Sequence, residues 1–147
     1  MNILFNTNEL ISVIKNIAPT AEAKQTLAVL GNMLVVVSNN RAVFTASDLE
    51  IEITSEVDCK SDTDGTFSIP AKKFLEVCNA LARHDEIQVN LSENKADVIA
   101  GKSKVSLPTL PASDFPLMKL DEPDQKSTIE TTELSKLINK TSFAMAY

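Results

Sequence analysis

"FNTNELISVI", residues 5–14, is a strand-to-helix junction, and its recurrence further along the chain decides the fold. The extended "NILFN" over residues 2–6 precedes it. Apolar residues then follow at helical spacing, and Thr7 or Asn8 offers the side chain preferred at a helix N-cap. The apolar positions are Leu10, Ile11, Val13, Ile14 and Ile17. This stretch predicts a strand over residues 2–6 and an amphipathic helix over residues 7–18.

The same junction recurs as "IETTELSKLI" over residues 129–138, displaced by 124 positions. Four of ten residues are identical: Thr7/Thr131, Glu9/Glu133, Leu10/Leu134 and Ile14/Ile138. Repeats of this length indicate a modular array. We therefore expect a complete first domain over residues 1–125 and the truncated start of a second domain over residues 126–147, in a chain that is cut short.

A weaker match, displaced by about half that distance, divides the first domain into two halves. Residues 7–17 laid on residues 71–81 share only Val13/Val77, although their apolar positions coincide. Each half also has the same order of elements, a strand, a helix and then three strands. The expected strands are residues 32–38, 41–47, 49–58, 65–70, 86–91, 96–101 and 103–107, and the second helix is residues 71–83. The predicted class is α+β, a duplicated strand–helix–three-strand unit with two helices packed on antiparallel sheets.

Composition excludes several classes of protein. The 147 residues are 44% hydrophobic and 23% charged, and no apolar run approaches the roughly 20 residues of a membrane span. No signal-peptide pattern opens the chain, and Cys59 and Cys78 show no metal-ligand spacing. We expect a cytoplasmic protein with no metal and no cofactor.

Charge is distributed unevenly along the chain, whose formal net charge is −6. Residues 40–67 hold seven acidic and two basic residues, whereas residues 70–84 hold three basic and one acidic residue. The exposed faces expected for the two helices are Asn8, Ser12, Lys15 and Asn16, and Lys72, Glu76, Asn79 and Arg83. Both faces could be ordinary solvated surface. Alternatively, the two faces together could lie near a phosphate backbone without binding it tightly.

"GKSKVSLPTLPASDFP", residues 101–116, places two lysines on a short strand and then ends it with prolines. Lys102 and Lys104 are expected on one face, with Val105 and Leu107 on the other. Lysines often occur at a free sheet edge, where they disfavour pairing with another strand. These two lysines could equally face a partner.

Five segments carry a family resemblance over the whole chain: "LAVLGNMLV", "TASDLEIEI", "SIPAKKFLEVCNAL", "SKVSLPTLPASDFP" and "TSFAMA". They resemble the bacterial DNA polymerase III beta subunit, the sliding clamp family. The resemblance implies a subunit of three similar domains, each with two copies of the repeated unit. Two subunits would join head to tail into a ring that encircles duplex DNA and tethers the polymerase. The expected role is a non-catalytic processivity factor, with weak contacts to the DNA backbone.

The resemblance also assigns residues. Lys73, Lys102 and Lys104 would face acidic residues of the other subunit, and Leu81, Val105 and Leu107 would supply the apolar part of that contact. Lys24 would touch DNA, with Lys15, Lys72 and Arg83 as further lining charges. Relatives carry arginine at positions 102 and 104 and an aromatic residue at position 105, so this contact is expected to be weaker or differently arranged here.

Partners of the whole protein follow from the same resemblance. The polymerase and the clamp loader would bind through domains that are largely absent from this chain. Two other classes stay open on the residues alone. Asp48, Glu50 and Glu52 are expected to alternate on one face of a strand, where an enzyme could use them as paired acids or cation ligands. A β-rich self-association module would need no DNA.

Overall fold

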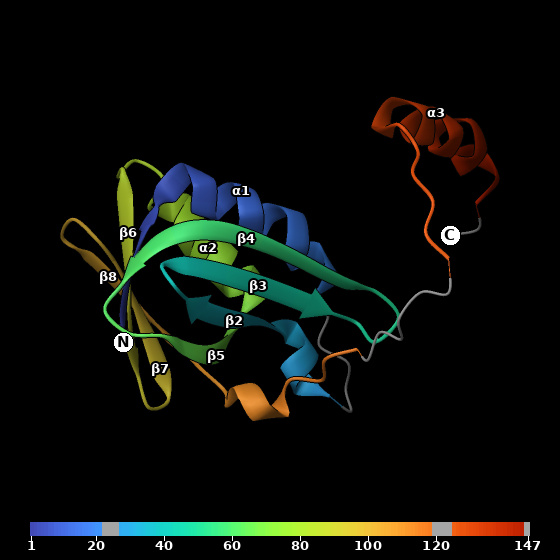
Figure 1. The fold of residues 1–147 in the computed structure, drawn as a ribbon. Helices are drawn as coiled ribbons and strands as arrows, with labels where there is room; N and C mark the ends of the chain where they lie inside the picture. The colour runs from blue at the N-terminus through green and yellow to red at the C-terminus, as the bar shows by residue number, and fades with distance from the viewer. Residues whose placement is uncertain (22–26, 119–124, 146–147) are drawn as a thin grey trace.

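The computed structural model describes residues 1–21, 27–118 and 125–145. Eight strands and two helices make up the body of the fold, and a third helix follows (Figure 1). The strands are β1 (Asn2–Asn6), β2 (Asn32–Ser38), β3 (Arg41–Ser47), β4 (Glu52–Ser61), β5 (Gly65–Pro70), β6 (Glu86–Ser92), β7 (Lys95–Ala100) and β8 (Ser103–Pro108). The helices are α1 (Thr7–Ile17), α2 (Ala71–Ala80) and α3 (Thr131–Thr141), and the 3-10 turns are η1 (Ala18–Thr20), η2 (Ala28–Gly31), η3 (Ala112–Asp114) and η4 (Ser142–Ala144). The predicted order of strand, helix and three strands, repeated once, is confirmed.

All eight strands belong to one antiparallel sheet, in the order β5-β2-β3-β4-β1-β6-β7-β8. The first strand of each repeat pairs within the other repeat: β5 joins β2, β3 and β4, and β1 joins β6, β7 and β8. The two four-stranded halves meet where β1 pairs with the last three residues of β4. The two sheets expected from the sequence are therefore halves of a single sheet, joined at this short seam.

Helices α1 and α2 lie against one face of the sheet and enclose the core with it (Figure 1). Leu10, Ile14 and Ile17 of α1 are fully buried, as the helical spacing predicts, and Ile11 and Val13 are partly buried against the same core. The largest buried side chains come from both helices and both halves of the sheet: Phe5, Leu10, Ile14, Phe44, Ile69, Phe74 and Ile87. The halves therefore share one hydrophobic core.

Three local details differ from expectation or extend it. The N-cap of α1 is Asn6, whose side chain accepts from the backbone N–H groups of Asn8 and Glu9, so Thr7 or Asn8 as N-cap was wrong. Pro70 is the N-cap of α2 and lies just before its first turn. Strands β2 and β3 form a hairpin whose turn residues, Asn39 and Asn40, both adopt positive φ, which asparagine tolerates.

The start of β4 was predicted wrongly. Asp48 accepts from the backbone N–H groups of Glu50 and Ile51, at 2.9 and 2.7 Å, and Leu49 has φ of 77°. This Asx-type turn precedes the strand, which begins only at Glu52. Asp48, Glu50 and Glu52 consequently do not alternate along one strand face.

Helix α3 repeats α1 in its bounds as well as in its residues. Both helices have eleven residues and both continue into a three-residue 3-10 turn, at the displacement of 124 seen in the sequence. Their environments differ, because Leu10 and Ile14 are 0% exposed whereas Leu134 and Ile138 are 44% and 53% exposed. In Figure 1, α3 stands apart from the sheet. Among the described residues, no helix is long and apolar enough to cross a membrane.

Candidate partner and nucleic-acid interfaces

Strand β8 is an edge of the sheet. It pairs with β7 along its whole length, and a single bridge, between Ser68 of β5 and Leu110, links the chain after β8 to the opposite edge of the sheet. Within the described residues, Ser103–Leu107 has no strand on its outer side. We name this stretch, together with the neighbouring Lys102 and Lys73, the basic edge.

Lys102 lies in the β7–β8 turn, and only Lys104 is on the strand, so the expected strand face with both lysines was wrong. The turn is formed by Gly101, whose φ is +56°. A side chain there would be strained, and its Cβ would lie 2.6 Å from the His84 ring. The imidazole that follows α2 therefore packs against the turn that presents Lys102.

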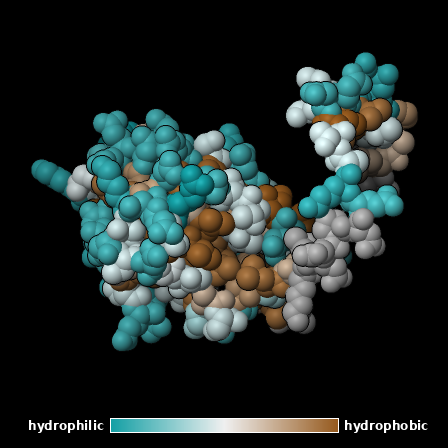
Figure 2. Space-filling view, viewed as in Figure 1, coloured by the Kyte–Doolittle hydropathy of each residue, from teal (hydrophilic) through white to brown (hydrophobic). Residues whose placement is uncertain are grey.

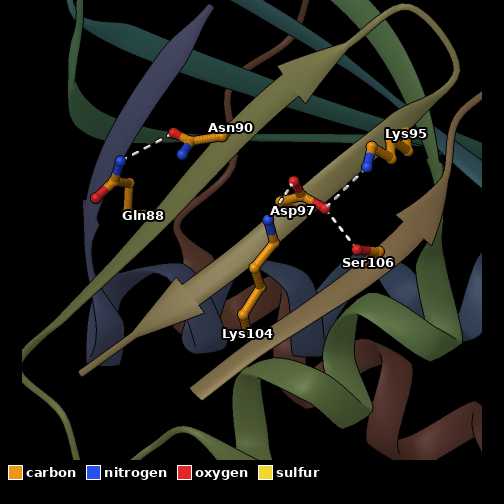
Figure 3. A network of polar contacts seen from close by, with 6 residues as sticks. All are labelled: Gln88, Asn90, Lys95, Asp97, Lys104 and Ser106. Atoms are coloured by element: carbon orange, nitrogen blue, oxygen red, sulfur yellow. Dashed lines mark hydrogen bonds and ion pairs between the residues drawn. The ribbon is translucent and has the colours of Figure 1, made fainter. Parts of the chain in front are cut away.

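A polar network holds Lys104 on the outer face of β8 (Figure 3). Its ammonium group lies 2.9 Å from Oδ2 of Asp97 on β7, and the hydroxyl of Ser106 donates to Oδ1 of the same carboxylate. Lys95 lies 4.0 Å from that oxygen. The Ser106 hydrogen bond and then the Lys104 ammonium group lower the pKa of Asp97 below its usual value. Lys104 thus already has an acidic partner in its own chain.

Sequence reasoning missed Asp97 and Ser106. They meet because the β7–β8 register places them directly opposite each other. That register depends on the turn at Gly101, and the alternation of apolar residues along either strand does not specify it. The signal was the glycine itself: a two-residue hairpin turn at Gly101 and Lys102 would have paired the two residues.

The apolar residues assigned to the partner contact differ in accessibility. Val105 is 38% exposed, whereas Leu81 and Leu107 are 5% and 7% exposed and belong to the core of this chain. Lys73 lies on the exposed side of α2 and forms an ion pair of 2.8 Å with Glu76, one turn along the helix. The structure therefore offers Lys73, Lys102, Lys104 and Val105 at the surface, with the two leucines beneath them.

The basic residues assigned to DNA are exposed on or beside the helices. Lys15 and Lys72 lie on α1 and α2, and neither forms an ion pair with any residue that the structure describes. Arg83 follows α2, where its Nε–H donates to Nε2 of His84 at 3.3 Å. A mostly apolar hollow of about 280 Å³ separates the end of α1 from α2, with Lys72 at its rim. Lys24 lies outside the described residues.

An acidic groove runs between α1 and β4. Its volume is about 600 Å³ and it is lined by Asn8, Glu9, Ser12, Val13, Arg41, Glu56, Val57 and Asp58. Arg41 pairs with Glu56 at 3.0 Å and with Asp58 at 3.4 Å, at exposed positions. A second hollow of about 270 Å³ shares Glu9 and Asp58 and extends the groove toward β1.

No group of three or more metal-binding side chains occurs within residues 1–21, 27–118 and 125–145. Both cysteines are buried and free. Burial raises the pKa of Cys78 to about 12, and burial with the nearby Asp58 raises the pKa of Cys59. A raised pKa disfavours the thiolate, so neither thiol has the character of an activated nucleophile.

The fold is α+β, with one continuous sheet, two helices on one of its faces and a charged free edge at β8, and it resembles domains of the DNA-clamp class. The family model described as DNA polymerase III beta subunit, N-terminal domain, matches residues 1–119. The chain belongs to this family.

Individual relatives agree with the family match. The chain is 35% identical to the beta sliding clamp of Vibrio cholerae over 147 residues, which is 99% of this chain and 40% of that protein. It is also 32% identical to a beta sliding clamp sequence from Vibrio harveyi, covering 98% of this chain and all of that sequence.

Solved structures show the same fold. A sliding clamp (DNA polymerase III subunit beta) from Pseudomonas aeruginosa matches with a TM-score of 0.93 and 34% identity, over 100% of this chain and 40% of the other. The sliding clamp from Caulobacter crescentus gives a TM-score of 0.91 at 30% identity, over 99% and 40% of the two chains. The chain thus spans about 40% of the length of most of these relatives.

Proposed function

We propose that this chain is the first part of a bacterial sliding clamp, a ring that encircles duplex DNA and tethers the replicative polymerase. The observation that carries the proposal is the family match over residues 1–119, together with solved sliding clamps of the same fold. The proposed role is non-catalytic and uses no cofactor. The protein would act on DNA in the bacterial cytoplasm, at the nucleoid during replication.

The domain boundaries belong to the same proposal. Residues 1–125 would form the complete first clamp domain, and residues 126–147 would begin the second. The shared bounds of α1 and α3, and the exposed apolar side of α3, support this division. An amphipathic helix gains most of its stability by burying its apolar face, so α3 would require a sheet of its own.

Enclosure explains how an acidic protein can hold DNA. A closed ring holds DNA because the DNA passes through it. The contacts inside the ring can therefore stay weak and independent of sequence, as sliding requires. Lys15, Lys72, Arg83 and Lys24 would approach the phosphate backbone, and such contacts are non-specific and salt-sensitive.

The two subunits would join head to tail through the basic edge. Lys73, Lys102 and Lys104 would face acidic residues of the other subunit, with Val105 in contact and Leu81 and Leu107 supporting the surface from the core. Pairing a free strand with another chain would also resolve the exposed edge of β8. The polymerase and the clamp loader would bind regions outside this chain.

Primer extension on a long single-stranded circle tests the function. The protein that carries this domain, with its clamp loader, should change short polymerase products into long ones. A triple variant, Lys15→Glu with Lys72→Glu and Arg83→Glu, should shorten the products and increase their salt sensitivity, whereas Lys60→Glu with Lys126→Glu, at exposed positions outside the helices, should not. Product length that does not depend on the protein would contradict the proposal and favour a self-association module without DNA.

A further inference from the structure

Two of the three lysines of the basic edge are already paired with carboxylates of the same chain. Lys73 forms an ion pair of 2.8 Å with Glu76, and Lys104 forms one of 2.9 Å with Asp97. Within the part of the chain that the structure describes, Lys102 is the one lysine of this edge without an ion pair. A surface that would meet an acidic partner therefore carries two negative charges of its own.

The fold holds these two carboxylates with very different firmness. The side chains of Lys73 and Glu76 are 68% and 63% exposed, so either can turn toward water at little cost. The Asp97 side chain is only 11% exposed. It also accepts a hydrogen bond from Ser106, which the β7–β8 register places directly opposite. Figure 3 shows Asp97 enclosed by two lysines and this serine, so it is a fixed negative charge beside the edge.

The fixed carboxylate changes what Lys104 can offer to an acidic partner. An ammonium group has three donors, so a partner carboxylate could bind Lys104 without displacing Asp97, but it would then lie close to a like charge. If the partner instead drew Lys104 away, Asp97 would lose its closest cation at a largely buried position, which is costly. Both routes weaken the attraction between Lys104 and an acidic partner.

We propose that Asp97 is an intramolecular competitor that weakens the binding of an acidic partner surface to the basic edge. The inference rests on the proposed function, in which this edge meets acidic residues of another subunit. A closed ring must open before it can admit circular DNA. A contact that one subunit weakens from within separates more readily, so Asp97 would ease the opening of the ring at this edge.

Removal of the Asp97 charge should therefore have two effects of opposite sign. Asp97→Asn keeps the size of the side chain and frees Lys104, so the subunits should bind each other more tightly. The same substitution removes an ion pair within the fold, so the domain should be less stable to heat at neutral pH. If Asp97 only supported the local structure, its replacement would weaken the domain and the subunit contact together.

Exchange of labelled subunits in the intact protein that carries this domain tests the inference. One batch carries a donor dye and one an acceptor dye, and the rise in energy transfer after mixing gives the rate at which subunits separate. Asp97→Asn should slow the exchange by roughly two- to fivefold, the range for one exposed ion pair. Asp97→Thr, a second variant suited to a strand, should do the same. Asp114→Asn removes an exposed carboxylate outside the sheet and should leave the rate unchanged.

A double-mutant cycle shows whether the effect acts through Lys104. In a Lys104→Met background, addition of Asp97→Asn should no longer slow the exchange, and circular dichroism establishes that each variant is folded. Exchange of the Asp97 variants as fast as that of the parent, or slowing that persists without Lys104, would overturn this inference alone. Parent proteins that never associate would contradict the head-to-tail contact of the proposed function as well.

Discussion

Single polar side chains set the local geometry of the candidate interfaces. Asn6 begins α1 by accepting two backbone N–H groups, and Asp97 links β7 to the edge strand through Lys104 and Ser106. Both residues have short side chains that form hydrogen bonds or ion pairs with nearby groups. Each leads to a prediction about the stability of the fold.

Asn6→Ala should lower the free energy of unfolding by about 1 kcal/mol, because a helix N-cap of this type is typically worth about that much. Urea denaturation of the 147-residue chain measures it. The control is Asn16→Ala on the exposed side of the same helix, which should be neutral or slightly stabilising because alanine has the higher helix propensity. Equal effects at both positions would show that the Asn6 cap does not stabilise the helix.

Asp97→Asn should lower the melting temperature at neutral pH and have little effect in strong acid. The folded-state pKa of Asp97 is depressed, so its contribution is fully present above the unfolded value of about 4 and is lost as pH falls through the folded value. Thermal melts at neutral and acidic pH test this, with exposed Asp114→Asn as the control. A destabilisation independent of pH would mean that the carboxylate charge is not what matters.

At the scale of elements, local periodicity predicted most of the structure. The bounds of β1, β2, β3 and β5 agree with the predicted strands, because polar, glycine or proline residues mark both ends of each β-rich run. The start of β4 was missed because Asp48 and Leu49 continue the alternation while the Asp48 side chain closes a turn.

The candidate site was less predictable than the elements. The joined sheet, the Asp97 network and the acidic groove all depend on contacts between distant segments, and no local pattern contains them. Strand and helix patterns identified Lys15, Lys72, Lys102 and Lys104 as surface residues, and the family resemblance assigned them to partners. That resemblance could not tell that Leu81 and Leu107 lie inside the core of this chain.

The repeated helices give a matched test at this scale. Ile14→Ala should lower the free energy of unfolding by roughly 2–5 kcal/mol, because Ile14 is fully buried. Ile138→Ala, at the same position of the repeat, should change it by less than about 0.5 kcal/mol because that side chain is half exposed. Urea denaturation of both variants compares them. A large loss at Ile138 would show that α3 is packed.

At the scale of the whole molecule, one surface view separates apolar from polar regions. Figure 2 shows apolar side chains gathered around β2 and β3, while the side of the view over β6 and β8 is mostly hydrophilic. The β8 edge carries Lys104 on the strand and Lys102 in the turn before it, and its outer side is free to pair with another chain. If the ring closes around DNA, the protein would stay on DNA for a long time even though its edge contacts and its few lining lysines bind weakly.

Retention on DNA of defined topology tests the central claim most directly. The intact protein carrying this domain is loaded onto a nicked circular plasmid, free protein is removed by gel filtration, and half of the sample is then linearised with a restriction enzyme. If the ring holds DNA by enclosure, the protein should stay with the closed circles and leave the linear molecules over their ends. Equal retention on circular and linear DNA, or loss from both at the same rate, would contradict enclosure as the means of holding DNA.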